Sequence, residues 1–290
     1  MFDSIAGDYD SLNHILSLDV DKIWRKKALK QIVDAPAPAR VLDLACGTGD
    51  FSIAIAKALS RSHKRVGTPV EAHVKASVKA PVKAPVKAPV EAPVEAPAKV
   101  PVEAQVTSTG FVTGGSGKSD SATKGHVTGV DLSEGMLAVM REKIGKAGLA
   151  DMISIEEGDG EALRFPDNTF DRVTIAFGIR NFEDRPKGLR EMLRVLKPGG
   201  RLVILELSRP ENKVIRWFYD LYFLHILPKV GGKVSGDKAA YAYLPASVNT
   251  FKTFDLRILN LLATMREAGF RTVTHKAFTL GICRMYTGEK

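Results

Sequence analysis

A low-complexity segment in the first half of the chain most constrains how this sequence can fold. Residues 70–104 read VEAHVKASVKAPVKAPVKAPVEAPVEAPAKVPVEA, with proline at every fourth position over much of the run. Proline lacks a backbone N–H donor and disfavours helical geometry at the residue before it. A stretch rich in Gly, Ser and Thr follows, up to residue 125. We therefore expect residues 61–126 to be a disordered insertion rich in Ala, Pro, Val and Lys.

The insertion has two interpretations. It could serve as a tether or docking arm, or it could be a surface loop that the domain tolerates. We favour the tolerated loop, because the entropy of closing a loop grows slowly with its length. Removing these 66 residues from the 290 leaves 224, which suits one domain. We predict a single domain made of residues 1–60 and 127–290.

Outside the insertion, short apolar runs alternate with segments of helical periodicity. Strands are predicted at 40–44, 127–131, 154–157, 170–176, 201–207, 272–278 and 284–287. Helices are predicted at 50–59, 134–145, 185–196, 214–223 and 254–267. This alternation predicts an α/β, Rossmann-like fold, with a mostly parallel seven-stranded sheet and helices on both faces.

The net charge of +9 does not by itself indicate a nucleic-acid partner. The insertion contains ten Lys/Arg and five Asp/Glu, so it contributes +5 of that charge. A basic groove with interleaved aromatic residues is not visible elsewhere. We therefore expect no nucleic-acid partner.

Cysteine content and hydropathy bear on the cellular compartment. Cys46 and Cys283 are the two cysteines, the N-terminus lacks a secretory pattern, and no apolar run reaches eighteen residues. These features predict a cytoplasmic protein without disulfides or transmembrane helices. Cysteines and histidines do not cluster with zinc-like spacing, so we expect no metal site.

The first predicted strand leads into a glycine turn. Gly47 and Gly49 form a Gly-x-Gly pattern, which lets a ligand approach the backbone closely. A dinucleotide-binding turn expects a third glycine, but Ser52 occupies that position. Asp43 lies four residues before Gly47, and its carboxylate favours a cationic ligand over a phosphate.

Two further strand ends carry acidic residues. Asp131, followed by Leu132, ends the second strand, and Asp159 and Gly160 follow the third. Asp131 lies 88 residues after Asp43, or 22 once the insertion is set aside, which is the spacing of a ribose-binding acidic residue in a β-α-β unit. Each strand end alone could be an ordinary turn. Together they predict a site for S-adenosyl-L-methionine and therefore a methyltransferase.

Longer motifs make the prediction more specific. They are MFDSIAGDYDSLNH at 1–14, VLDLACGTGD at 41–50, GVDLSEGML at 129–137, FPDNTFDRV at 165–173, FGIRNFEDRPKGL at 177–189 and RVLKPGGRLVILELSRP at 194–210. With these motifs the chain resembles the ubiquinone/menaquinone biosynthesis C-methyltransferase family, which belongs to the class I methyltransferases. The resemblance covers nearly everything outside the insertion, which is not part of the family pattern.

The resemblance implies a cofactor site and a reaction. S-adenosyl-L-methionine would contact Thr48, Asp131 and the Asp159–Gly160 pair, with Ala176 near the sulfonium. Many relatives carry Ser at the position of Ala176. The reaction would convert a demethylmenaquinol, a prenylated quinol, into menaquinol. The sequence does not separate naphthoquinol from benzoquinol substrates.

Candidate catalytic residues lie past the fourth strand and in possible lid segments. Arg180 could stabilise a developing phenolate or hold a water that accepts the proton; the alternative is an ion pair with Glu183 or Asp184. Tyr243 is a second candidate. The segments that could cover the substrate contain Tyr9, Asn13, His14, Tyr241 and Tyr243.

Residues 214–227 are unusually aromatic. They could line a pocket for an isoprenoid tail, or form a peripheral membrane contact through which the substrate enters, or cover the sheet. The sequence leaves the oligomeric state open, with a homodimer as one alternative.

Two other functions compete with the quinol C-methyltransferase. One is a methyltransferase with another small-molecule substrate, against which FGIRNF and the N-terminal motif argue. The other is a non-catalytic binding module, against which the intact acidic strand ends argue.

Overall fold

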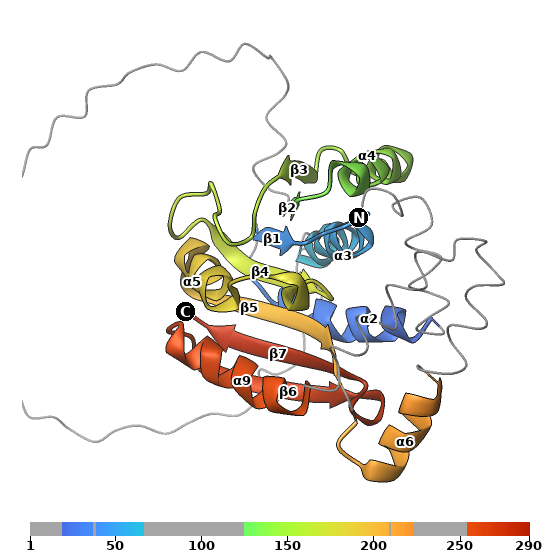
Figure 1. The fold of residues 1–290 in the computed structure, drawn as a ribbon. Coiled ribbons are helices and arrows are strands. Elements are labelled where there is room, and N and C mark those ends of the chain that lie inside the picture. Colours follow the sequence, from blue (N-terminus) through green and yellow to red (C-terminus); the bar gives the residue numbers. More distant parts are fainter. Residues whose placement is uncertain (1–18, 37–38, 67–124, 209, 223–253) are drawn as a thin grey trace, which may run out of the picture. The chain divides into compact units, whose positions relative to one another are not determined.

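Figure 1 shows the computed structural model, which describes residues 19–36, 39–66, 125–208, 210–222 and 254–290. The chain divides into two units: Met1–Gly67 with Asp120–Lys290, and Thr68–Ser119. The second unit, and with it most of the expected insertion, lies outside the described residues. Helix α3 (Asp50–Val66) continues six residues into the expected insertion, and strand β2 (His126–Asp131) begins at its last residue.

The first unit contains a seven-stranded sheet with the order β3-β2-β1-β4-β5-β7-β6. The other strands are β1 (Arg40–Leu44), β3 (Ile153–Glu157), β4 (Phe170–Ala176), β5 (Leu196–Leu207), β6 (Arg271–Phe278) and β7 (Cys283–Glu289). The first five strands are mutually parallel, and β7 runs antiparallel to both β5 and β6. The mostly parallel α/β sheet that the sequence predicted is confirmed.

Strands β1 and β2 pair directly although the expected insertion separates them in sequence. Arg40 lies opposite His126, and the register continues to Leu44 opposite Val130. The N–H of His126 donates to the carbonyl of Ala39 at 2.8 Å. The described parts of the chain before and after the expected insertion therefore contribute neighbouring strands to one continuous sheet.

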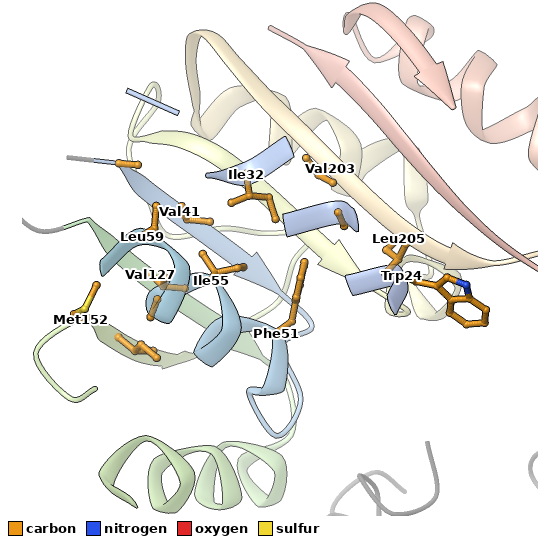
Figure 2. Packing of buried hydrophobic residues seen from close by; sticks show 14 of the residues in the cluster. Trp24, Ile32, Val41, Phe51, Ile55, Leu59, Val127, Met152, Val203 and Leu205 are labelled. Atoms are coloured by element: carbon orange, nitrogen blue, oxygen red, sulfur yellow. The ribbon is translucent and has the colours of Figure 1, made fainter. Parts of the chain in front are cut away.

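Helices cover both faces of the sheet, because successive strand residues point to opposite sides. In β1, Val41 packs with α2 (Val20–Ile32), α3 and α4 (Glu134–Ala147), as Figure 2 shows for part of this cluster. Leu42 and Leu44 pack on the other face, with α5 (Arg185–Val195) and α9 (Phe254–Glu267). Both faces are apolar, which explains the nearly continuous apolar runs in the strands.

Side-chain caps fix where two helices begin beside the strand ends. Ser133 accepts a hydrogen bond from the N–H of Met136 at the start of α4, and Asp184 accepts one from Lys187 at the start of α5. Each such cap typically contributes about 1 kcal/mol. Asp184 therefore serves as a helix cap.

Several element bounds differ by a few residues from the sequence-based expectation, and the larger differences lie at α2, at the end of α3 and at the α5–β5 junction. Helix α2 was not predicted, α5 ends at Val195 rather than 196, and β5 begins at Leu196 rather than 201. Leu196 pairs with Phe170 of β4, and a register shift follows before Arg172 pairs with Arg201. This long-range pairing draws the Lys-Pro-Gly-Gly segment into the strand. Helix α6 (Lys213–Leu221) follows β5, and two short 3-10 helices lie at Ile179–Asn181 and Thr279–Gly281.

Candidate functional site

The candidate site lies at the carboxyl ends of β1, β2, β3 and β4. The strand order reverses between β1 and β4, and ligands of open α/β sheets bind at such a switch point. A cavity of about 300 Å³ opens there. Of the residues predicted to bind cofactor, its wall includes Gly47, Asp131, Leu132, Asp159, Gly160 and Ala176. Asp43 and Thr48 line a smaller neighbouring cavity of about 40 Å³.

The glycine turn after β1 depends on left-handed backbone conformations. Ala45, Gly47 and Gly49 have φ of 48°, 56° and 82°. A Cβ at Gly49 would lie 2.4 Å from Cγ of Met140, so α4 packs directly on the turn. This position requires glycine for both conformation and space.

Asp131 connects the ends of β1 and β2. Its Oδ2 accepts a hydrogen bond from the N–H of Gly47 at 2.8 Å, and its Oδ1 accepts one from Ser133 at 3.0 Å. Each carboxylate oxygen can accept more than one hydrogen bond, so the group can also accept from ligand hydroxyls. Beside it, Leu132 is 68% exposed and forms an apolar part of the cavity wall.

The turn after β3 packs against a phenylalanine that the sequence analysis did not single out. Asp159 accepts a hydrogen bond from the N–H of Glu161 at 2.8 Å. A Cβ at Gly160 would lie 2.5 Å from Cζ of Phe182, and a Cβ at Gly188 would be equally close to the same ring. Phe182 therefore forms a wall of the cavity. It lies in the FGIRNF motif, which was the available signal.

The turn after β4 meets the turn after β1. Phe177 has a φ of 61°, which is uncommon for a large side chain. A Cβ at Gly178 would lie 2.5 Å from Cβ of Ala45. The two turns are therefore in contact, and Ala176 and Phe177 line both cavities.

Arg180 has a different partner from those that the sequence suggested. Its Nη1 donates to Oε1 of Glu206 at 2.7 Å and to the carbonyl of Phe177, while its backbone N–H donates to Oε2 of Glu206. The sequence suggested an ion pair of Arg180 with Glu183 or Asp184 as the alternative to a catalytic role. In the structure the ion pair of Arg180 is with Glu206. Glu206 lies at the end of β5 and is 3% exposed. This ion pair closes the turn that carries Phe177.

Asp43 is buried beneath the glycine turn. Its Oδ2 accepts a hydrogen bond from Oγ of Ser52 at 2.5 Å. Burial raises the pKa of Asp43 to about 7, while the Ser52 hydrogen bond and the charge of Arg25 oppose this increase. A cation placed beside Asp43 would favour its ionised form.

Several predicted residues lie outside the described part of the chain. They are the lid candidates Tyr9, Asn13, His14, Tyr241 and Tyr243, and the end of the aromatic segment from residue 223. Among the described residues, no group of His, Cys, Asp or Glu side chains is arranged to hold a metal ion. No helix within the described ranges is both long enough and apolar enough to cross a membrane.

The chain matches the ubiE/COQ5 methyltransferase family over residues 1–290. A Geobacter sulfurreducens protein named ubiquinone/menaquinone biosynthesis C-methyltransferase UbiE is 39% identical, over 100% of this chain and 87% of that protein. The demethylmenaquinone methyltransferase of Bacteroides fragilis is 34% identical, over 100% of this chain and 91% of the relative. A SAM-dependent methyltransferase from Thermotoga maritima shares the fold, with a TM-score of 0.50, 15% identity, and coverage of 100% of this chain and 98% of that chain.

Proposed function

The chain belongs to the ubiE/COQ5 methyltransferase family, and we propose that it methylates a ring carbon of a demethylmenaquinol. The methyl donor is S-adenosyl-L-methionine. The observation that carries the proposal is the cavity at the switch point, where the glycine turn and the strand-end residues Asp131 and Asp159 meet. Two relatives of this chain bear names that specify quinone methylation.

The residues at the switch point fit the adenosine part of S-adenosyl-L-methionine. Asp131 is held by two backbone N–H groups and can accept from both ribose hydroxyls, while Leu132 offers an apolar surface beside it. Asp159 and Gly160 line the same cavity, and Phe182 limits the space behind Gly160. These features support an adenosine subsite between the ends of β2 and β3.

The reaction is a displacement that releases one proton. The cofactor supplies a methyl group on a positively charged sulfur, and the new carbon–carbon bond forms as the sulfur–methyl bond breaks. The ring carbon then loses its proton, which restores aromaticity. The contribution of the protein is to orient the two reactants and to exclude water.

Arg180 is proposed to act at the acceptor side of the cavity. As a permanent cation it would favour the phenolate form of the quinol, which is the better carbon nucleophile. Its pair with Glu206 supports a second contribution, because it fixes the turn from which Gly178 and Asn181 reach the cavity wall. Tyr243 stays a candidate from the sequence.

The prenylated substrate suggests a contact with the membrane surface, and α6 is the element that we propose for it. Trp217 and Phe218 are each 60% exposed, and Val214 is exposed beside them. Lys213 precedes Val214, and Arg216 lies between Val214 and Trp217 in the sequence of the helix. An amphipathic helix with aromatic and basic residues typically lies in the membrane interface.

Vesicle sedimentation tests this membrane contact. The double change Trp217→Ser and Phe218→Ser should reduce binding to vesicles that contain anionic lipid, while Ile23→Ser, an exposed apolar residue of α2, should not. Equal binding by the double variant and the wild type would contradict the contact. The expectations of a cytoplasmic location and of a homodimer stay predictions.

Calorimetry with S-adenosyl-L-homocysteine tests cofactor use. We expect Asp131→Asn to weaken binding roughly ten- to hundredfold, because hydrogen bonds to charged groups contribute about 1.5–3 kcal/mol. Asp151→Asn, at an exposed turn, serves as the matched control.

A competition assay tests the choice of acceptor ring. Demethylmenaquinol and the corresponding benzoquinol are offered together, and the methylated products are compared. A preference for the benzoquinol would contradict the proposed substrate.

A further inference from the structure

Arg25 on α2 is a half-buried arginine whose hydrogen-bonding groups are only partly used. Its Nη1 lies 3.5 Å from Oδ2 of Asp50, and its Nη2 lies 3.7 Å from Oδ2 of Asp21. Its Nε is buried and has no hydrogen-bond partner among the residues that the structure describes. Both ion pairs are long for charge-assisted hydrogen bonds, which are usually about 2.7–2.9 Å.

Arg194 provides a comparison within the same protein, because its guanidinium makes several short hydrogen bonds. Its guanidinium donates to Glu191, to Asp167 and to the carbonyls of Leu163 and Phe165, at distances of 2.7–2.9 Å. A guanidinium has five N–H donors in a planar fork that matches a carboxylate. Arg25 therefore retains donor capacity that Arg194 has already used.

Arg25 faces the smaller of the two cavities. That cavity is lined by Arg25, Asp43, Thr48 and Asp50, and it shares Ala45, Gly47, Ala176 and Phe177 with the larger cavity. The guanidinium of Arg25 lies 5.7 Å from the centre of the Phe177 ring, which restricts its position beside the β4 turn. The small cavity thus adjoins the adenosine subsite across the two turns.

The charges around this cavity match a zwitterion. Among the residues that line it, Arg25 offers a cation, and Asp43, buried beneath the glycine turn, offers a carboxyl group. The methionine part of S-adenosyl-L-methionine ends in one carboxylate and one ammonium. A phosphate or another simple anion would instead face Asp43 and Asp50 with like charge.

We propose that Arg25 binds the α-carboxylate of the methionine part of the cofactor, with the α-ammonium directed toward Asp43. This inference rests on the proposed function, since it assumes that S-adenosyl-L-methionine occupies the switch point. It assigns to α2 a direct part in cofactor recognition. Arg25 is then a specificity-determining residue, because it distinguishes the intact amino-acid group from shortened analogues.

Decarboxylated S-adenosyl-L-methionine is the probe that isolates this contact, because it lacks only the carboxylate. Affinities of the full-length protein for both compounds are measured by calorimetry. The wild type should prefer the intact cofactor roughly ten- to hundredfold, the range expected for charge-assisted hydrogen bonds. Arg25→Met should lose most of this preference while it binds the decarboxylated compound within about twofold of wild type.

Two further variants keep the test independent of folding. Arg25→Lys retains the charge without the planar fork and should keep part of the preference. Lys26→Met removes one charge from an exposed neighbour on the same helix and should behave as wild type. Retained binding of the decarboxylated compound by Arg25→Met itself shows that the adenosine subsite is folded.

Different results would overturn different claims. An equal loss of both affinities in Arg25→Met would mean that Arg25 supports the fold, and unchanged preference would mean that it does not contact the carboxylate; either overturns this inference alone. Wild-type protein that binds neither compound would overturn the proposed function, and this inference with it.

Discussion

The two turns that meet at the switch point are stabilised in different ways. The turn after β1 uses Gly47 and Gly49, which adopt positive φ without steric cost, and α4 packs on it. The turn after β4 places Phe177 at positive φ and is closed by Arg180 and Glu206. The first turn is determined by local residue types, and the second by an ion pair between distant parts of the chain. Substitutions should therefore affect them differently.

The largest effect is expected at Gly49. Gly49→Ala would place a Cβ 2.4 Å from Cγ of Met140 at a φ of 82°, so we expect a loss of ~3–5 kcal/mol in the free energy of unfolding. Urea denaturation measures the change. Gly145→Ala, within α4 and with open space around the new methyl group, should instead stabilise by about 0.5–1 kcal/mol. Similar results for the two variants would contradict the importance of this contact.

The ion pair at the second turn should have the next largest effect. Glu206→Ala leaves Arg180 without its buried partner, and we expect a loss of ~2–3 kcal/mol, below the usual range for buried pairs because Arg180 is partly exposed. Turnover should fall more than the affinity for S-adenosyl-L-homocysteine, since we propose that this turn lies at the acceptor side. Arg180→Ala should resemble Glu206→Ala if positioning dominates. Much greater loss of turnover in Arg180→Ala at equal stability would favour a direct catalytic role.

The sequence predicted the residues of the first turn, but it did not predict the ion pair between Arg180 and Glu206 that closes the second turn. The difference has a physical reason. Asp43, Gly47 and Asp131 follow strands whose apolar runs can be recognised locally, so their convergence follows from the parallel topology. Arg180 and Glu206 are 26 residues apart, and nothing in the intervening sequence specifies that they pair. The contact of Arg25 with the Phe177 ring likewise joins residues that are far apart in the sequence, so it depends on long-range packing.

Helix α2 illustrates a related limit. Its buried residues include Trp24, Ala28 and Ile32, one per turn, and charged residues separate them. So narrow an apolar stripe gives a weak periodic signal. All three side chains are nevertheless buried in the cluster of which Figure 2 labels Trp24 and Ile32. The sheet itself was predictable, since both of its faces are apolar.

A pH-dependent effect is expected for Asp43, behind the first turn. Its folded pKa of about 7 lies above the ordinary value of 3.8, so ionisation destabilises the folded protein as the pH rises from about 4 through 7. Asp43→Asn should therefore be more favourable relative to wild type at pH 8 than at pH 5, by roughly 2 kcal/mol and at most about 4 kcal/mol. Denaturation of the ligand-free protein at both pH values provides the measurement. A pH-independent difference would contradict the raised pKa.

The smallest effect is expected at Ala45, the non-glycine residue at positive φ in the first turn. Ala45→Gly should stabilise the protein by about 0.5–1 kcal/mol, because glycine adopts a φ of 48° without strain. Ala138→Gly, at an exposed position within α4, should destabilise by about 1 kcal/mol. Destabilisation by both changes would show that the methyl group of Ala45 matters more than its backbone conformation.

The central claim, that this chain methylates a quinol carbon, is tested most directly by following a labelled methyl group. The purified protein is incubated with demethylmenaquinol and S-adenosyl-L-methionine that carries a deuterated methyl group, and the lipid product is analysed by tandem mass spectrometry. We predict that the label appears on a ring carbon, as menaquinol. A label on a ring oxygen, or none on the quinol while the cofactor still binds, would contradict the account.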